Sequence, residues 1–296
     1  MQEAEPRYAI AESRSLLVVD GPDARSFLQG IVSNDVGKVT PEAAIWAAFL
    51  TPQGKYLHDF FIAQVGETLV LDCEAARRDD LSMRLRRYKL RAKVAIEPDD
   101  ARGVAVAFGE TALPPLGLPD TAGAAREIEG GTVYVDPRLP AAGARAILPT
   151  ARIEGLLETA GLRRSDTAAY DTLRIALGLP DGSRDLEIEK SLLIESGFNE
   201  LHGVDWNKGC YMGQELTART HYRALIKKRL VPVRVEGALP APGTPVTVDG
   251  KDVGVLRSGQ GDFALALLRL DRLSDDEPLR AGEARLTVRK PDWATF

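Results

Sequence analysis

The C-terminal quarter of the chain is patterned as short β-strands, and this pattern limits the possible fold more than any other feature. After a basic triplet, apolar residues alternate with polar ones in five stretches: 230–235, 245–248, 253–257, 263–269 and 285–289. Alternation of this length predicts half-buried strands, and Asp249-Gly250 is a typical hairpin turn. We therefore predict a small antiparallel barrel or sandwich, with a domain boundary near residue 227.

The preceding part of the chain mixes strand and helix patterns. Strands are predicted at 15–19, 43–51, 56–64, 68–73, 103–108 and 132–135, and at 93–96, where a strand should end before Pro98. Helices are predicted to open at Pro22, to begin near Asp79, and to cover 151–160 and 166–177. The sequence thus predicts an α+β region over residues 1–226 and a small barrel or sandwich domain over residues 227–296.

Composition excludes several classes of protein. Hydrophobic residues make up 44% of the 296 residues and charged residues 27%, which is typical of a globular chain and excludes collagen-like or wholly disordered proteins. The net charge of −5 argues against a general nucleic-acid-binding protein. Neither a long apolar run nor an N-terminal targeting pattern is visible. We expect a soluble, cytoplasmic protein that binds neither nucleic acid nor membranes.

The chain contains two cysteines, Cys73 and Cys210. Two thiols are too few for a disulfide scaffold, and too few for a zinc or iron–sulfur site built from this chain's thiolates alone, so no metal site is predicted. Cys210 lies between two glycines and close to Lys208, just before a helix-forming stretch. Such surroundings favour the thiolate and make Cys210 a candidate reactive thiol. The alternative is a small buried hydrophobe in a tight turn.

The run KGCYMGQE around Cys210 resembles the signature of the YgfZ family, folate-binding proteins related to the aminomethyltransferase of the glycine cleavage system. Further segments agree in order: LQGIVSNDV at 28–36, AAFLTPQGKYLHDFFI at 47–62, YKLRAKVAI at 88–96 and LRIALGLPDGSRDLEIEKSLLIESG at 173–197. The resemblance implies an α+β fold, in which an aminomethyltransferase-like folate-binding region of two packed α+β subdomains precedes a C-terminal antiparallel β-barrel.

The resemblance also implies a function and a set of ligands. The cofactor would be tetrahydrofolate or another reduced folate, bound between the α+β region and the barrel. The partners would be iron–sulfur client enzymes or assembly proteins. The protein would then be a tetrahydrofolate-binding accessory protein for the maturation or repair of iron–sulfur enzymes.

Site residues carry over from the resemblance position by position. The residues expected to act in chemistry are Cys210, Lys208 and Asp59. Those expected to bind folate are Asn34, Asp35, Tyr56, Asp59, Glu195, Tyr211, Gln214, Glu215, Arg219 and Arg223.

Three of these expectations have simpler alternatives. Asn34 and Asp35 fit a contact with the pterin and equally a turn with a local side-chain hydrogen bond. On an alternating strand only one of His58 and Asp59 should face a pocket; we expect Asp59 to do so, whereas His58 could lie on an exposed rim. The basic runs 84–93 and 219–229 either receive the carboxylates of a folate tail or form solvated faces.

Departures from the related enzymes define competing functions. His58 stands where the aminomethyltransferases have the first of two aspartates, and Ala176 stands where they have a glutamate that holds the pterin; Ala224 replaces a glycine usual in the YgfZ pattern. Because transfer chemistry needs charges aimed at a developing charge, we expect folate binding together with a thiol-dependent step at Cys210. The alternatives are a folate-dependent aminomethyl transferase with Asp59 as the acid–base group, and a scaffold whose folate pocket is a relic.

Overall fold

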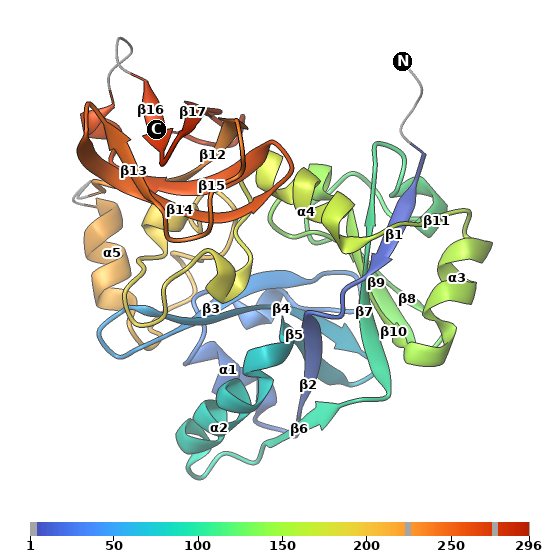
Figure 1. The fold of residues 1–296 in the computed structure, drawn as a ribbon. Coiled ribbons are helices and arrows are strands. Elements are labelled where there is room, and N and C mark those ends of the chain that lie inside the picture. Colours follow the sequence, from blue (N-terminus) through green and yellow to red (C-terminus); the bar gives the residue numbers. More distant parts are fainter. Residues whose placement is uncertain (1–4, 223–225, 274–277, 296) are drawn as a thin grey trace. The chain divides into compact units, whose positions relative to one another are not determined.

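The computed structural model describes residues 5–222, 226–273 and 278–295, and its ribbon is shown in Figure 1. The chain divides into two compact units, each built from segments that are distant in sequence. Unit 1 comprises Met1–Leu50, Leu57–Thr167 and His202–Met212. Unit 2 comprises Thr51–Tyr56, Ala168–Leu201 and Gly213–Phe296.

The first sheet of unit 1 has five strands in the order β3-β4-β5-β2-β6. Their bounds are β2 Arg14–Asp20, β3 Ile45–Leu50, β4 Tyr56–Val65, β5 Thr68–Glu74 and β6 Ala95–Asp99. Helices α1 (Ala24–Gln29) and α2 (Arg78–Lys89) pack on this sheet through a shared apolar core. In α2, Leu81 and Leu85 are buried one turn apart, whereas its first turn is acidic and its last turn basic, which suits the helix dipole.

The second sheet of unit 1 has six strands in the order β11-β1-β7-β10-β9-β8. Their bounds are β1 Arg7–Ile10, β7 Arg102–Phe108, β8 Ala125–Ile128, β9 Gly131–Val135, β10 Ala144–Pro149 and β11 Arg163–Arg164; α3 covers Ile153–Thr159. A buried ion cluster links the two sheets: Asp72 on β5 accepts hydrogen bonds from Arg14 on β2 (2.7 Å) and from Arg145 on β10 (2.6 Å). Two guanidinium groups compensate the charge of this fully buried carboxylate.

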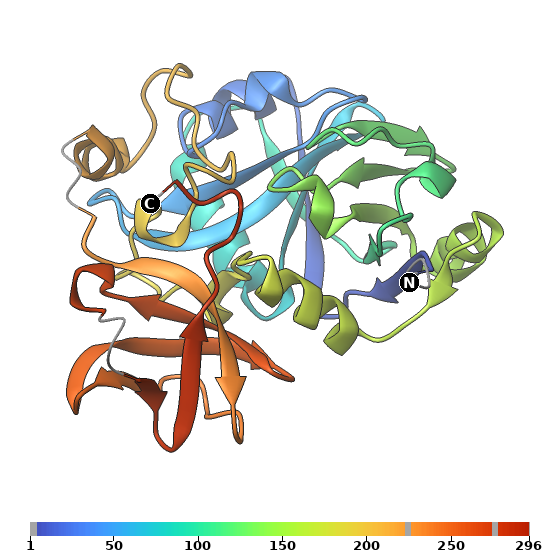
Figure 2. The ribbon, with the colours of Figure 1, turned by 90° about the horizontal axis from the view of Figure 1, so that it is seen from above.

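Unit 2 contains a closed six-stranded antiparallel barrel in the order β12-β15-β14-β13-β16-β17. Its strands are β12 Arg229–Glu236, β13 Pro245–Val248, β14 Lys251–Gln260, β15 Phe263–Leu268, β16 Leu279–Ala281 and β17 Ala284–Val288. These are the orange-to-red arrows of Figure 2. Small aliphatic side chains fill the barrel, and Asp249-Gly250 forms the predicted hairpin turn with positive φ at both residues. Helices α4 (Thr167–Ala176) and α5 (Gln214–Tyr222) complete the unit.

One predicted strand end is wrong. The strand expected to stop before Pro98 instead runs through it, since β6 covers Ala95–Asp99. Proline lacks the N–H that a central strand needs, but β6 lies at the edge of its sheet, where a ladder hydrogen bond is not required on both sides.

Candidate functional site

A cavity of about 500 Å³ lies within unit 1. Its lining comes from four parts of the chain, residues 34–46, 121–124, 137 and 202–204. The residues that form it include Asn34, Lys38, Glu42, Trp46, Pro137 and His202. At its wall the turn 121–124 closely approaches the start of β3. Gly123 has a φ of +78°, and a Cβ there would lie 2.5 Å from the carbonyl oxygen of Ala44, so only glycine allows this approach.

Asn34 holds the segments around the cavity together. Its side-chain Nδ2 donates hydrogen bonds to the carbonyl oxygens of Trp46 (2.8 Å) and His202 (2.7 Å). Its Oδ1 accepts from the backbone N–H of Asp35 at 2.8 Å. Asn34 therefore forms the local bond of a turn, as one of the two sequence interpretations expected, and it also lines the cavity.

Asp35 has a local structural role. Its Oδ1 accepts hydrogen bonds from the backbone N–H of Gly37 and from the Nε2 of Gln29, both at 2.9 Å. The first bond caps the short 3-10 turn that follows, Val36–Lys38. Asp35 is not among the residues that line the cavity.

Trp46 connects the cavity to the carboxylate of Asp59. The indole Nε1 of Trp46 on β3 donates a 3.0 Å hydrogen bond to Oδ2 of Asp59 on β4, and both residues are buried. The guanidinium carbon of Arg138 lies 5.5 Å from the centre of the Trp46 ring, where a cation–π contact is favourable. Sequence reasoning missed Trp46, although a tryptophan in the otherwise aliphatic and alanine-rich start of β3 was a visible signal.

The expectation that His58 could lie on an exposed rim is wrong. Its exposed fraction is 3%, because the face of β4 that carries it is covered. Its Nε2 lies 2.9 Å from Oδ2 of Asp80 on α2. Burial, aided by the nearby positive charge of Arg77, lowers the pKa of His58 to about 4, so this imidazole is neutral at pH 7.

The loop of the KGCYMGQE run is fastened to the end of α1. The Nζ of Lys208 donates hydrogen bonds to the carbonyl oxygens of Gln29 (2.7 Å) and Val32 (2.5 Å). The N–H of Met212 donates to the carbonyl oxygen of Gly30 at 3.2 Å. Burial lowers the pKa of Lys208 to about 8, against the opposing effect of two carboxylates, so its ammonium group is still mostly charged at pH 7.

Between these two anchors the loop exposes Cys210. The alternative reading of Cys210 as a small buried hydrophobe is therefore wrong. Its neighbour Tyr211 is buried, and the Nζ of Lys208 lies 5.1 Å from the centre of the Tyr211 ring. Cys73 is the opposite case: it is buried, its Sγ lies 3.4 Å from the carbonyl oxygen of Ser15, and burial raises its pKa to about 12. The two thiols thus have opposite environments.

The other predicted site residues belong to unit 2. Tyr56 is buried, and its backbone N–H donates to the carbonyl oxygen of Ser191 at 3.1 Å. Glu195 is half-buried, and burial raises its pKa although Lys228, Lys55 and Arg229 oppose the shift. A raised carboxyl pKa is one mark of a functional group.

Helix α5 carries the remaining predicted residues. Gln214 begins this helix, and Glu215 and Arg219 are exposed on it, with their charged atoms 4.0 Å apart. An exposed pair of this kind contributes little to stability. Arg223 lies outside the described residues.

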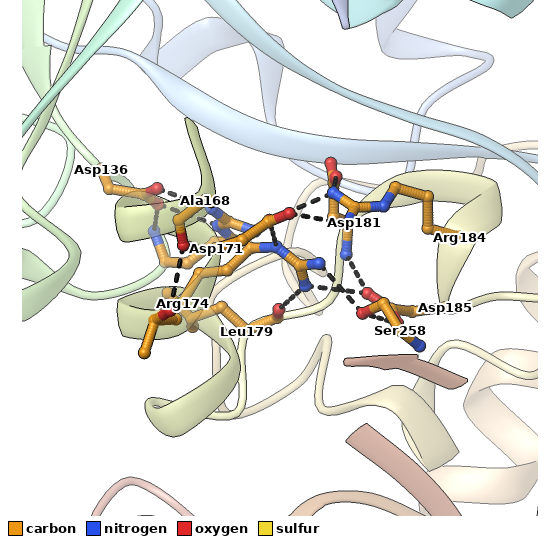
Figure 3. A network of polar contacts seen from close by, with 11 residues as sticks. Asp136, Ala168, Asp171, Arg174, Leu179, Asp181, Arg184, Asp185 and Ser258 are labelled. Carbon is orange, nitrogen blue, oxygen red and sulfur yellow. Dashed lines mark hydrogen bonds and ion pairs between the residues drawn. The ribbon is translucent and has the colours of Figure 1, made fainter. Parts of the chain in front are cut away.

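A second group of polar contacts organises unit 2, and sequence reasoning missed it as well. Arg174 on α4 is fully buried, and its guanidinium group binds Asp171 (2.7 Å), Asp185 (2.9 Å) and the Oγ of Ser258 on β14 (2.9 Å). Figure 3 shows these contacts converging on Arg174. The network ties α4 and the loop around Asp185 to the barrel.

The fold defines the class of the protein. Over 99% of the chain, the structure is similar to the crystal structure of glycine cleavage system aminomethyltransferase T from Bartonella henselae, with a TM-score of 0.79, 17% sequence identity and coverage of 87% of that chain. Residues 227–296 match the family model described as the CAF17 C-terminal beta-barrel domain. The predicted fold class, an aminomethyltransferase-like α+β region with a C-terminal antiparallel β-barrel, is confirmed.

Sequence comparison then gives the family. The chain is 34% identical to "Iron-sulfur cluster assembly factor IBA57, mitochondrial" of Mus musculus, over 95% of this chain and 84% of the relative. It is 35% identical to the protein of the same name from Homo sapiens, over 95% of this chain and 83% of the relative. The chain belongs to the IBA57 family of iron–sulfur cluster assembly factors.

The same relatives correct the expected location. Both have "mitochondrial" in their names, which contradicts the expectation of a cytoplasmic protein. That expectation rested on composition, on the small number of cysteines and on the lack of a recognisable targeting pattern, and these properties do not distinguish one reducing compartment from another. Within the described ranges, no helix combines the length and apolar character that crossing a membrane requires.

Proposed function

We propose that this protein is a folate-binding member of the YgfZ family that supports the assembly or repair of iron–sulfur clusters in client enzymes through the thiol of Cys210. The observation that carries the proposal is the exposure of Cys210 on a loop anchored on both sides of it, by Lys208 and by Met212. An exposed thiol on a fixed backbone can meet a partner protein without first rearranging its own loop. Membership of the IBA57 family points to the same role.

Any cluster at Cys210 must be shared with another protein. Only two cysteines occur in the chain, and Cys73 is buried. Among the described residues, no three His, Cys, Asp or Glu side chains gather in a way that could hold a metal ion. Iron–sulfur clusters usually have four protein ligands. Transient ligation or thiol exchange at Cys210 therefore requires a client enzyme or an assembly protein that supplies the other groups.

The volume and the lining of the cavity of unit 1 support the folate-binding part of the proposal. Its volume of about 500 Å³ is in the range of small-molecule sites. Trp46 supplies an aromatic side chain, and Asn34, Lys38 and Glu42 supply polar groups. In this proposal the pterin lies in the cavity beside Trp46, and the anionic tail is held by basic residues. When bound, a reduced folate supplies a carrier of one-carbon units.

The surroundings of Asp59 and His58 favour binding over transfer. Asp59 is buried and accepts a hydrogen bond from Trp46, while His58 is neutral and faces Asp80 on α2. One carboxylate therefore remains where the transferases have two. Binding tolerates this loss better than stabilisation of a transition state does. We expect folate binding without aminomethyl transfer at ordinary enzymatic rates.

The decisive experiment compares three variants in cells that lack the native protein. Cys210→Ser should abolish support of iron–sulfur enzyme activities, whereas Asp59→Asn should have a mild effect. Cys73→Ala, the matched control, should behave as wild type because Cys73 is buried. Loss of activity with Asp59→Asn but not with Cys210→Ser would favour the transferase instead.

Folate binding is tested on the purified protein. Tetrahydrofolate should raise the melting temperature of wild type and of Cys210→Ser equally, since ligands that bind only the folded state stabilise it. The shift should shrink as salt rises, because the folate tail is anionic. No heat in calorimetry and no thermal shift with any reduced folate would remove the folate from the proposal and leave the scaffold alternative.

The division into a folate-binding region, residues 1–226, and a barrel domain, residues 227–296, is also part of the proposal. Limited proteolysis that cuts first near residue 227 would support this boundary, because exposed linkers are the preferred sites of cleavage.

A further inference from the structure

The turn that follows α2 presents an apolar side chain to solvent in a strained backbone conformation. Leu90 has an exposed fraction of 88%, with φ +46° and ψ −108°. These angles correspond to the first central position of a type II′ turn, which is closed by a 2.8 Å hydrogen bond from the N–H of Ala92 to the carbonyl oxygen of Lys89. Glycine is usual at that position.

The positive φ of Leu90 is not offset by burial of its side chain. Five non-glycine residues in the described part of the chain have positive φ, and Leu90 is the only apolar one among them. Its backbone is strained, and because its side chain is exposed, no apolar burial offsets the cost of this strain. Backbone strain of this kind concentrates at sites that bind ligands or partners.

Uncompensated positive charge surrounds Leu90. Arg84 and Arg86, earlier on α2, are paired with Asp80 and Glu97. Arg87, Lys89, Arg91 and Lys93 lie nearer the turn and differ in this respect. Within the part of the chain that the structure describes, no carboxylate forms an ion pair with any of them. Four positive charges thus gather on a chain whose net charge is −5.

A shallow groove of about 540 Å³ adjoins this charge. Met83, with an exposed fraction of 45%, and the exposed Pro98 supply apolar surface, and Arg86 and Arg87 lie among its lining residues. We use the name α2 surface for the groove residues Met83, Arg86, Arg87 and Pro98 together with the turn residues Lys89, Leu90, Arg91 and Lys93.

We propose that the α2 surface docks an acidic segment of a partner protein that carries apolar side chains. Carboxylates of the segment would pair with the four uncompensated bases, and its apolar residues would contact Leu90, Met83 and Pro98. Such charge complementarity steers association and selects the partner. This docking surface is separate from the proposed chemistry at Cys210.

The observations favour a protein over a nucleic acid or an anionic membrane. Asp79 also lines the groove and is almost fully exposed, so the positive surface is interrupted where a regular phosphate backbone or a layer of headgroups would need it to be continuous, whereas a protein segment can place a neutral side chain there. The groove combines the apolar side chains of Met83 and Pro98 with the charged Arg86 and Arg87, and this mixture matches the side chains of a protein segment better than a uniform phosphate backbone.

The test uses the full-length protein and a defined probe: a fluorescein-labelled amphipathic peptide of Glu, Asp and Leu, with its leucines at helical spacing. The control peptide has Gln and Asn in place of Glu and Asp. Binding is followed by fluorescence anisotropy. One variant neutralises the α2 surface, with Arg87, Lys89, Arg91 and Lys93 all changed to Gln. Its matched control neutralises four exposed bases of the barrel, with Arg234, Lys251, Arg280 and Arg285 changed to Gln.

We expect the acidic peptide to bind wild type and the barrel variant equally, and to bind the α2-surface variant about tenfold more weakly. Leu90→Gly should keep the turn, because glycine favours it, and should weaken binding severalfold. The control peptide should bind weakly to all proteins. Equal binding by the two charge variants, or unchanged binding by Leu90→Gly, would overturn the proposal. Tighter binding of duplex DNA or of phosphatidylserine vesicles than of the peptide would overturn it too.

Discussion

The indole Nε1 of Trp46 donates a 3.0 Å hydrogen bond to Oδ2 of Asp59, and the same tryptophan lines the cavity of unit 1. The two residues come from β3 and β4, which are neighbours in the first sheet. A buried carboxylate needs hydrogen-bond donors, and the indole supplies one in a fixed direction. Trp46, which lines the cavity, therefore also orients Asp59, the carboxylate that the sequence resemblance matches to one of the two aspartates of the transferases.

Trp46→Phe should weaken both stability and folate binding. It keeps a ring at the cavity but removes the donor to Asp59, so unfolding in urea should show a loss of about 1–3 kcal/mol. The melting-temperature shift produced by tetrahydrofolate should fall as well. Trp293→Phe is the control: it removes an indole donor to the carbonyl oxygen of Leu177 in unit 2 and should leave the folate shift as in wild type. Equal folate shifts in wild type and Trp46→Phe would contradict the placement of the pterin.

Cys210 should react with iodoacetamide before Cys73 does. Cys210 is exposed, whereas Cys73 is buried and burial raises its pKa to about 12, which disfavours the nucleophilic thiolate. Mass spectrometry of the native protein after brief labelling measures the order directly. In urea both thiols should label at similar rates. Preferential labelling of Cys73 in the native state would show that the exposed loop is not the reactive one.

The network around Arg174 should contribute strongly to the stability of unit 2. Asp185→Asn leaves a fully buried guanidinium group with one fewer compensating charge, and breaking a buried pair costs about 3 kcal/mol or more. Glu154→Gln is the control, because it removes an exposed partner of Arg164 and should cost less than about 1 kcal/mol. Urea denaturation measures both. Equal stability of the two variants would mean that the buried pair contributes no more than a surface pair.

Local patterns predicted those parts of the fold that local interactions determine. Alternation and the Asp249-Gly250 turn predicted the barrel hairpin, and the helical spacing of Leu81 and Leu85 predicted α2. The same reasoning missed β1, β8, β10, β11 and β16. Four of these have only two to four residues, and β10 is set by pairing with β7 and β9 rather than by alternation. Pairing between distant segments is not visible in a short window of sequence.

In the candidate site, too, contacts between distant residues could not be predicted from a short window of sequence. The local sequence around Cys210 singled out this residue as a candidate, and resemblance to a family added Asp59, because such a comparison matches positions one by one. Trp46 and Arg174 were not predicted, because their roles depend on the residues with which they form hydrogen bonds. Asp59 is 13 residues from Trp46, and Ser258 is 84 residues from Arg174. That Arg174 is buried rather than solvated follows from tertiary packing, which a basic residue in an amphipathic helix does not reveal.

Lys208→Met should loosen the loop that carries Cys210. It removes the ammonium group that donates to the carbonyl oxygens of Gln29 and Val32, while the methionine fills a similar volume. Two partly buried acceptors then lose their donor, which should cost about 1–3 kcal/mol. Amide hydrogen exchange at residues 209–212 should become faster than in wild type. Lys190→Met, which removes an exposed ion pair with Glu187, should change neither quantity. Unchanged exchange in Lys208→Met would show that the loop is held in some other way.

The stability of the protein should depend on His58 in acid. Burial lowers the pKa of folded His58 to about 4 from an ordinary value of 6.5, so between these values the unfolded chain binds a proton that the folded protein does not. The contribution of His58 to the free energy of unfolding is thus fully present above pH 6.5. It is lost as the pH falls from 6.5 towards 4, and the loss is on the order of 3 kcal/mol. His58→Asn should therefore lose less stability than wild type over this interval when both are unfolded in urea. His202→Asn replaces an exposed histidine at a positive φ that asparagine tolerates, and it should follow wild type. If the free energy of unfolding falls equally with pH in wild type and in His58→Asn, then folded His58 is protonated over this interval as readily as His58 of the unfolded chain.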